Sequence, residues 1–342
     1  MDVYSRLVRP LLFRLTGDQA HYLARIALRF APLWCTVGSR SRFSSPRLAT
    51  SMTRLRLANP IGLAPGLDKD GQFVRALSQL DFGYLVVGSI TKNPRPGNPF
   101  PRLIRYPEEM AIANCMGLPS EGLKKAIHTL SQRPATPAVV VGSVAGSTRD
   151  ELYECAEGIE PYVDAVEIGL VCPNATAEER VEELHIFTDL AESLVARRRK
   201  PLFFKLPPYF DDAGRQRAMA MLDMCLRTGV DGISIAGNTS IEEPRLSTGQ
   251  GSLSGRPAMV DTLRITRDFA PRCRGKLFLR VSGGVFTGSD ALELLRAGAD
   301  AVELYTAFIY RGWNAAGLIA RELDAAMQAA GASGLADIHG SR

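Results

Sequence analysis

The chain has 342 residues, 46% of them hydrophobic and 23% charged, so it can bury a large core and is not expected to be disordered. A net charge of +5, without any Lys/Arg run that carries interleaved aromatic residues, excludes nucleic acid as an expected partner. The six cysteines are irregularly spaced and the four histidines are scattered, which favours free thiols in a reducing compartment and predicts no metal site.

Residues 1–42 differ from the rest because they carry seven arginines and apolar residues at helical spacing. Four leucines can share one face of a first helix: Leu7, Leu11, Leu12 and Leu15. Asp18 is placed to cap a second helix, which runs through Phe30 and is ended by Pro32. Two amphipathic helices with arginine on the polar face suit an anionic bilayer surface, although helices packed on a main domain have the same pattern. Neither a secretory signal nor a run of ~18 apolar residues, as a transmembrane helix needs, is present.

From about residue 55, short apolar runs alternate with helical patterns. The candidate strands are Ile61–Ala64, Leu85–Gly88, Ala138–Gly142, Ala165–Gly169, Leu202–Lys205, Gly232–Ala236, Leu277–Val281 and Ala301–Leu304. Helical patterns between them include Glu179–Arg199, Gln216–Thr228, Met259–Phe269 and Ser289–Ala297. Eight strands alternating with helices predict an α/β fold, a (β/α)8 TIM barrel over residues 43–342. A doubly wound sheet is the alternative, but the G-x-G-x-x-G turn expected of a dinucleotide binder is missing.

Polar or glycine-rich motifs follow almost every predicted strand, at the end of a barrel where active sites lie. After the first strand, Gly66 allows close approach to a ligand and Lys69 could meet an anion. Cys172, fixed by the following proline, could accept a proton, and Lys205 at the end of the fifth strand could stabilise negative charge. The alternatives are a tight surface turn, a buried inert thiol and a solvent-seeking lysine.

The loops after the last three strands suggest a phosphate site built from backbone N–H groups. The segments concerned are Asn238–Ser240, Gly251–Pro257, Ser282–Val285 and Tyr305–Thr306. Ordinary turn chemistry would explain any single one of these loops, so the prediction depends on their occurring together.

The motifs together resemble those of dihydroorotate dehydrogenases. The matching segments are Asn59–Gly71, Pro94–Asn98, Pro101–Leu103, Ser254–Pro257 and Ser282–Gly284. The N-terminal helices resemble those of the membrane-associated, quinone-dependent class, in which they shape a quinone tunnel. The resemblance implies FMN-dependent oxidation of dihydroorotate in pyrimidine biosynthesis. It also implies a quinone acceptor and peripheral attachment to the cytoplasmic face of the cell membrane.

The resemblance also implies roles for individual residues. FMN would contact Ala64, Gly66, Ser89, Ser143, Lys205, Gly255, Gly283, Gly284, Tyr305 and Thr306. Substrate would contact Lys69, Asn114, Asn174, Asn238 and Thr239. Cys172 matches the catalytic base, Lys205 would stabilise the reduced flavin, and His21 and Arg105 match positions in the quinone tunnel.

Some positions depart from the family pattern. The quinone class usually has serine as the base where this chain has Cys172, and Gly169 and Ser143 replace asparagines. The substrate loop, Asn114–Ser120, has also lost amides. Because lost hydrogen bonds can change substrate choice, an FMN-dependent paralogue with another small-molecule substrate is the alternative hypothesis. A non-catalytic flavin-binding or scaffold protein is a third, against which the intact Cys172 and Lys205 argue.

Overall fold

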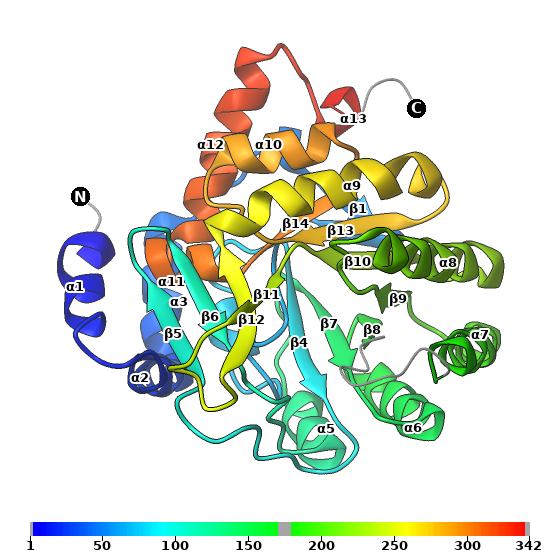
Figure 1. The fold of residues 1–342 in the computed structure, drawn as a ribbon. Coiled ribbons are helices and arrows are strands. Elements are labelled where there is room, and N and C mark those ends of the chain that lie inside the picture. The colour runs from blue at the N-terminus through cyan, green and yellow to red at the C-terminus, as the bar shows by residue number, and fades with distance from the viewer. Residues whose placement is uncertain (1–2, 170–178, 339–342) are drawn as a thin grey trace.

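The computed structural model describes residues 3–169 and 179–338. Its centre is a closed barrel of parallel strands in the order β10-β13-β14-β3-β4-β7-β8-β9 (Figure 1). The barrel strands are β3 (Ile61–Leu63), β4 (Tyr84–Ile90), β7 (Val139–Val144), β8 (Ala165–Gly169), β9 (Leu202–Lys205), β10 (Gly232–Ala236), β13 (Phe278–Ser282) and β14 (Ala301–Leu304). The predicted (β/α)8 barrel is confirmed, and every predicted strand agrees with an observed one to within two residues at each end.

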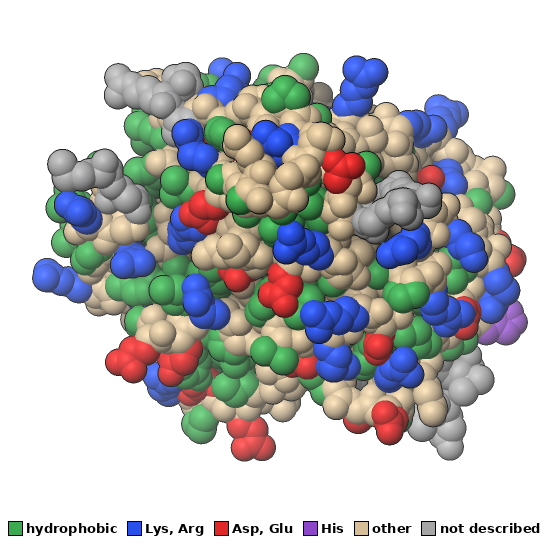
Figure 2. Space-filling model, turned by 90° about the horizontal axis from the view of Figure 1, so that it is seen from above, with side chains coloured by type: hydrophobic (Ala, Val, Ile, Leu, Met, Phe, Trp, Pro, Cys, Tyr) green, Lys and Arg blue, Asp and Glu red, His purple; other side chains and the backbone are tan. Residues whose placement is uncertain are grey.

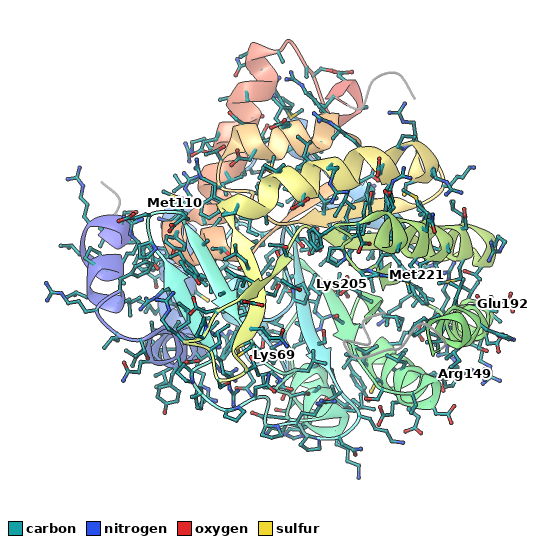
Figure 3. All side chains as sticks on the ribbon, in the orientation of Figure 1. Lys69, Met110, Arg149, Glu192, Lys205 and Met221 are labelled. Atoms are coloured by element: carbon teal, nitrogen blue, oxygen red, sulfur yellow. The ribbon has the colours of Figure 1, made fainter. Side chains whose placement is uncertain are left out.

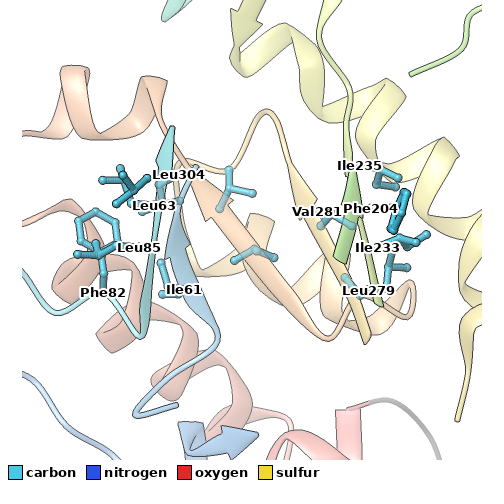
Figure 4. Close-up of a cluster of buried hydrophobic side chains, with 14 of the residues drawn as sticks. Ile61, Leu63, Phe82, Leu85, Phe204, Ile233, Ile235, Leu279, Val281 and Leu304 are labelled. Carbon is cyan, nitrogen blue, oxygen red and sulfur yellow. The ribbon is translucent and has the colours of Figure 1, made fainter. Parts of the chain in front are cut away.

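Helices surround the barrel because outward-facing strand residues are apolar and need a cover. The helices after β3 are α4 (Val74–Leu77), α5 (Leu123–Ser131), α6 (Arg149–Ile159), α7 (Glu179–Arg197), α8 (Asp212–Thr228), α9 (Met259–Cys273), α10 (Gly288–Arg296), α11 (Thr306–Arg311), α12 (Ala315–Ala329) and α13 (Leu335–Ile338). Short 3-10 turns are η2 (Pro46–Leu48), η3 (Glu160–Tyr162) and η4 (Arg256–Ala258). Leu63, Leu85 and Leu304, from three neighbouring strands, lie together in the shell between strands and helices (Figure 4).

At the end of the barrel where the strands begin, the interior is apolar and closed. A hairpin of β1 (Thr50–Met52) and β2 (Leu55–Leu57) places Met52 and Leu57 against inward-facing Tyr84 and Phe203. This packing leaves the opposite end, where the strands have their carboxyl ends, for a site.

A four-stranded antiparallel sheet lies beside the barrel mouth and was not predicted. It has the order β11-β12-β6-β5 and consists of β5 (Leu103–Tyr106), β6 (Ala111–Asn114), β11 (Thr239–Glu242) and β12 (Gln250–Gly255). Its strands come from the connections after β4 and β10, so two insertions that are distant in sequence build one element between the barrel and the N-terminal helices (Figure 1).

The predicted helical extension is present, and it has one helix more than expected. A π-helical turn η1 (Tyr4–Val8) continues into α1 (Arg9–Leu12), and α2 (Gly17–Arg29) and α3 (Ala31–Ser41) follow. Pro32 does follow the end of α2, but it lies in the first turn of α3, where a missing N–H costs nothing. In the described ranges, no helix has the length and apolar character that crossing a bilayer requires.

The predicted cap of the second helix was wrong. Thr16, not Asp18, caps α2, because its hydroxyl accepts the N–H of Gln19 at 3.2 Å while the Gln19 side chain accepts the N–H of Thr16. The Asp18 carboxylate instead accepts the backbone N–H of Arg102 at 2.9 Å. Asp18 therefore ties the extension to the start of β5.

Candidate active site

A cavity of about 1480 Å³ opens at the carboxyl ends of the barrel strands, beside β6 and β12. The structure brings these predicted site residues together in its lining: Ala64, Gly66, Lys69, Asn114, Lys205, Asn238, Gly255, Gly283, Gly284, Tyr305 and Thr306. Cys172 and Asn174 lie outside the described residues. The cavity therefore collects residues predicted for both the cofactor and the substrate.

Three predicted residues do not line this cavity. Ser143 is fully buried, and its hydroxyl lies 3.3 Å from that of Ser89, so both are occupied within the barrel wall. Thr239 begins β11 and its hydroxyl contacts the carbonyl of Ser240 at 3.5 Å. A serine is shorter than the asparagine that the resemblance implies at position 143, so it does not reach out of the wall.

One side of the cavity is made of closely packed backbone. Gly283 and Gly284 have φ angles of 116° and 83°, which favour glycine. A Cβ at Gly283 would lie 2.6 Å from the Thr262 hydroxyl, and one at Gly284 would collide with Met259. The hydroxyl of Ser254 lies 2.9 Å from that of Thr306 and joins the neighbouring loops. This wall of backbone and small hydroxyl groups suits a phosphate.

Two lysines give the cavity its positive charge. Lys69, after β3, is buried, and Lys205 ends β9; both are labelled at the barrel mouth in Figure 3. Burial, and then repulsion by Lys205, lowers the pKa of Lys69 to about 8. Because the two lysines repel each other, the cavity favours an anionic ligand, whose charge would relieve the repulsion.

A buried ionic cluster, Glu167–Arg280–Glu303, fills the barrel core next to this cavity. Arg280 forms ion pairs with Glu167 and with Glu303, the latter at 3.3 Å between Nη1 and Oε1. Ser234 donates to Glu167 at 2.7 Å, and the Tyr84 hydroxyl lies 3.3 Å from Glu303. All three charged side chains are at most 3% exposed, and Glu303 also lines the cavity.

The pKa values of the two glutamates move apart. Burial raises the pKa of Glu303 despite the nearby Arg280. Burial acts in the same direction on Glu167, but Arg280, Lys205 and the hydrogen bond from Ser234 outweigh it and lower the pKa of Glu167. This cluster was not predicted from the sequence. The sequence does contain a signal for it, because each of the three residues is the only charged one in a mainly apolar strand, as in Val166-Glu167-Ile168 and Val302-Glu303-Leu304.

A second, apolar cavity of about 980 Å³ lies between the barrel and the extension. Leu103, Ile112 and Tyr305 line both cavities, so the two share a wall. His21 and Arg105, predicted for a quinone tunnel, both line the apolar cavity. That shared wall consists of a tyrosine and two aliphatic side chains.

Arg105 and His21 differ in what they do in this wall. The Arg105 guanidinium donates to the carbonyls of Leu12, at 3.2 Å, and Leu15, and it lies 4.4 Å from the centre of the Phe13 ring. Burial, and then the positive charges of Arg25 and Lys69, lowers the pKa of His21 to about 4. Arg105 thus holds the turn before α2, and His21 is neutral near pH 7.

The extension also carries much of the exposed apolar surface. Large hydrophobic side chains that are more than 40% exposed include Val3, Leu7, Leu11, Tyr22, Leu23, Ile26, Phe30 and Leu33. On the side of the molecule that holds the extension, at the left in Figures 1 and 2, hydrophobic side chains reach the surface beside basic ones. Helices whose apolar side chains point to solvent suggest a surface that another apolar phase covers.

Residues 47–327 match the family model described as dihydroorotate dehydrogenase. A protein of Methylococcus capsulatus named dihydroorotate dehydrogenase (quinone) is 32% identical over 91% of this chain and 96% of its own length. One of the same name from Cereibacter sphaeroides is 33% identical over 100% of this chain and 98% of its own length. The solved structure of an Eimeria tenella dihydroorotate dehydrogenase in complex with ferulenol superposes with a TM-score of 0.80 at 26% identity, covering 96% of this chain and 97% of that one. This chain belongs to the dihydroorotate dehydrogenase family.

Proposed function

We propose that this protein is an FMN-dependent oxidoreductase that converts dihydroorotate to orotate and passes the electrons to a quinone. One observation carries the proposal: a cationic cavity with a glycine-lined backbone wall shares Leu103, Ile112 and Tyr305 with an apolar cavity. A polar reductant and an apolar oxidant can then reach opposite sides of one cofactor. The relatives named dihydroorotate dehydrogenase (quinone), which match over nearly their whole length, support this assignment.

The cationic cavity fits FMN. Gly255, Gly283, Gly284 and Thr306 would hold its phosphate, because they form the closely packed backbone wall. Ala64, Gly66 and Tyr305 would flank its ring, with Lys205 beside the ring and Ser89 and Ser143 in the supporting strands. When bound, FMN takes an electron pair from the substrate and gives it up to the quinone.

The remaining polar residues suit a small anionic substrate. Lys69 would bind the carboxylate of dihydroorotate, and Asn114, Asn174, Asn238 and Thr239 would bind the carbonyl and N–H groups of its ring. Asn114 donates to the carbonyl of Ser252 at 3.2 Å, which fixes its amide at the edge of the cavity. Cys172 would remove the proton from the substrate carbon; Cys172 and Asn174 belong to this proposal by resemblance alone.

The apolar cavity suits the quinone, and the extension suits the surface of a membrane. We place the protein at the cytoplasmic face of the cell membrane as a peripheral protein. The exposed apolar side chains of α2 and of the residue that follows it, such as Ile26 and Phe30, would enter the bilayer. A quinone could then pass from the bilayer between the helices without entering water. Residues 1–42 form the membrane and quinone module in this proposal, and residues 43–342 form the FMN-binding barrel.

Turnover of dihydroorotate with a soluble quinone tests the whole proposal. The purified protein should be yellow, produce orotate, and reduce one quinone for each orotate formed. Cys172→Ala should retain FMN but slow the reduction of FMN by dihydroorotate by roughly 10²–10⁴, the usual contribution of a general base. A protein that cannot be loaded with FMN would overturn the proposal, and unchanged reduction kinetics in the variant would remove Cys172 from it.

A second candidate function is the oxidation or reduction of another small molecule by the same cofactor. One observation favours it. A Cβ built at Gly169 would lie 3.2 Å from the carbonyl oxygen of Val144. Apart from the chain neighbours of Gly169, no other atom of the described residues would lie within 4 Å of it, so no described side chain fills the space beside Gly169. Met116 and Leu118 also add apolar lining to the cationic cavity. A yellow protein that binds FMN but forms no orotate from dihydroorotate would favour this second function over the first.

A further inference from the structure

The Glu167–Arg280–Glu303 cluster is costly in a barrel core. Removing a charged group from water costs several kcal/mol for each ion, and an apolar layer of similar volume is often at least as stable. The Oε1 atom of Glu167 and the Nε atom of Arg280 have no hydrogen-bond partner among the described residues. Stability therefore does not explain why three charges occupy this layer. Buried charges that adjoin a cavity are characteristic of functional sites.

Glu303 is the member of the cluster that reaches the cavity. It is the one carboxyl group among the described lining residues, whereas the two charged side chains of opposite sign there are Lys69 and Lys205. Within the barrel core, its Oε1 atom forms an ion pair with Arg280 and accepts a hydrogen bond from the Tyr84 hydroxyl. Tyr305, the first residue after β14, follows Glu303 by two positions and lines the wall shared by the two cavities.

The cluster is neutral when Lys205 is counted with it, since Lys205 interacts electrostatically with both glutamates. Two glutamates then balance one arginine and one lysine. Reduction of a flavin bound in the cavity that Glu303 lines would add negative charge there. In a low-dielectric cavity an uncompensated charge is strongly unfavourable, so a group nearby must change its own charge or the reduced state is destabilised.

Each charged or titratable group that faces Glu303 from the surrounding strands can be considered in turn. Arg280, on β13, stays charged because a guanidinium does not lose its proton in a protein. Tyr84, on β4, stays neutral because burial raises its pKa well above the ordinary value. Glu167, on β8, is paired closely with Arg280 and stays ionised. Lys205, on β9, is already the cation of the cavity. Lys69, after β3, lines the same cavity with a pKa lowered to about 8, but it is present in wild type and in a Glu303 variant alike, so a comparison of the two isolates Glu303. Among the groups on the strands themselves, Glu303 alone can take up a proton.

We propose that Glu303 is the proton-accepting group that compensates the cofactor: it binds one proton when the cofactor gains an electron pair and releases it on reoxidation. This inference rests on the proposed FMN function. The electron pair comes from the substrate, and the proton comes from solvent and forms one O–H bond on the carboxylate of Glu303. No other bond at Glu303 forms or breaks. The pKa of Glu303, raised by burial, agrees in direction with this role, because an added negative charge nearby favours the protonated carboxyl further.

Proton uptake on reduction tests the inference directly. The FMN-loaded protein is reduced with electrochemically reduced viologen, which brings electrons without protons, in weakly buffered solution with a pH-indicator dye. At one or more pH values of a series that spans about pH 6 to 9, wild type should bind up to about one proton more per electron pair than Glu303→Gln. Glu243→Gln is the matched control, since Glu243 is also a buried carboxyl paired with an arginine but lies beyond β11, outside the barrel core. The control should behave as wild type does.

Equal uptake by wild type and Glu303→Gln at every pH would overturn the inference. If Glu303→Gln does not fold, the wild-type protein labelled with ¹³C-glutamate serves instead. Its reduced-minus-oxidised infrared spectrum should gain a protonated carboxyl band that the label shifts, and absence of a labelled band would overturn the inference. A protein that binds no FMN gives no reduction signal at all, which would count against the proposed function rather than against Glu303.

Discussion

His21 is a titratable side chain buried where the extension meets the barrel. Its pKa in the folded protein, about 4, is below the ordinary value of 6.5, with burial as the largest cause. Between these two values the unfolded chain binds more protons than the folded one. The stability that neutral His21 contributes is therefore present above pH 6.5 and is lost as the pH falls towards 4.

Replacing His21 by glutamine should remove this pH dependence. Between pH 6.5 and 4, the free energy of unfolding should fall less in His21→Gln than in wild type, by at most about 3 kcal/mol, since one pKa unit is worth about 1.4 kcal/mol. Denaturant titrations of both proteins at several pH values measure the difference. Parallel curves would show that His21 is not buried in its neutral form.

Arg280 offers a test of how the buried cluster is balanced. Arg280→Met leaves two glutamates without their cation, which should cost about 3–5 kcal/mol in the free energy of unfolding. Adding Glu167→Gln and Glu303→Gln to that variant should recover much of the loss, because no uncompensated charge remains. Arg215→Met is a suitable control, since the pair of Arg215 with Asp268 is partly exposed and should contribute less than about 1 kcal/mol. A loss of similar size in both arginine variants would contradict the assignment of a charge-balanced core.

At the scale of elements, the extension combines tethering to the barrel with an apolar outer face. Tyr4 donates to the carbonyl of Ile309 at 2.5 Å, and Asp18 accepts from Arg102, so the helices are fixed at several points. Ile26 on α2 and Phe30 directly after it are nevertheless 46% and 64% exposed. A helix that is held in place and still exposes large apolar side chains is suited to insertion into the interfacial region of a bilayer.

Replacing Ile26 and Phe30 together by glutamate should weaken binding to anionic vesicles by at least about tenfold. Each large apolar side chain contributes about 1.5–3 kcal/mol when fully buried, and ~1.4 kcal/mol corresponds to a factor of ten. Val260→Glu is the matched control, because Val260 is 75% exposed on α9 of the barrel. Cosedimentation with vesicles measures the difference. The membrane proposal fails if the double variant and the control bind equally.

The barrel strands could be predicted because their signal is local. A buried parallel strand needs a predominantly apolar run between turn residues, and each of the eight runs has at most one charged or polar residue. The antiparallel sheet could not be predicted in the same way. The β12 sequence Gln250–Gly255 has the composition of a loop, and it becomes a strand because β6 and β11 pair with it from either side. β11 precedes β12 closely in the chain, but β6 is distant in sequence, and a pairing with so distant a segment leaves no periodic signal.

The candidate site shows the same division between local and distant information. Glycines and lysines that follow strands could be predicted as site residues because the barrel brings the carboxyl ends of its strands together. The Glu167–Arg280–Glu303 cluster could not, although each charge stands out within its own strand. The closure of the barrel determines which inward-facing residues of β8, β13 and β14 come into contact. The sequence of a single strand does not show which residues of the other strands it will contact.

At the scale of the whole molecule, the two cavities divide the proposed reaction into two halves. Leu103, Ile112 and Tyr305 belong to both linings, but the extension contributes only to the apolar one. Substrate oxidation should then depend on the barrel alone, and quinone reduction on the barrel and the extension together. A change in the extension should separate the two half-reactions.

Ala24→Trp should make that separation visible. Ala24 lines the apolar cavity from α2, so a tryptophan there would fill space that the quinone needs. Turnover with quinone should fall by at least about tenfold, a loss of ~1.4 kcal/mol in quinone interaction, while stopped-flow reduction of FMN by dihydroorotate stays within about twofold of wild type. Leu23→Trp puts the same side chain on the exposed face of α2 and should leave both half-reactions unchanged. If Ala24→Trp slows both half-reactions equally, or neither, the apolar cavity is not the path of the quinone.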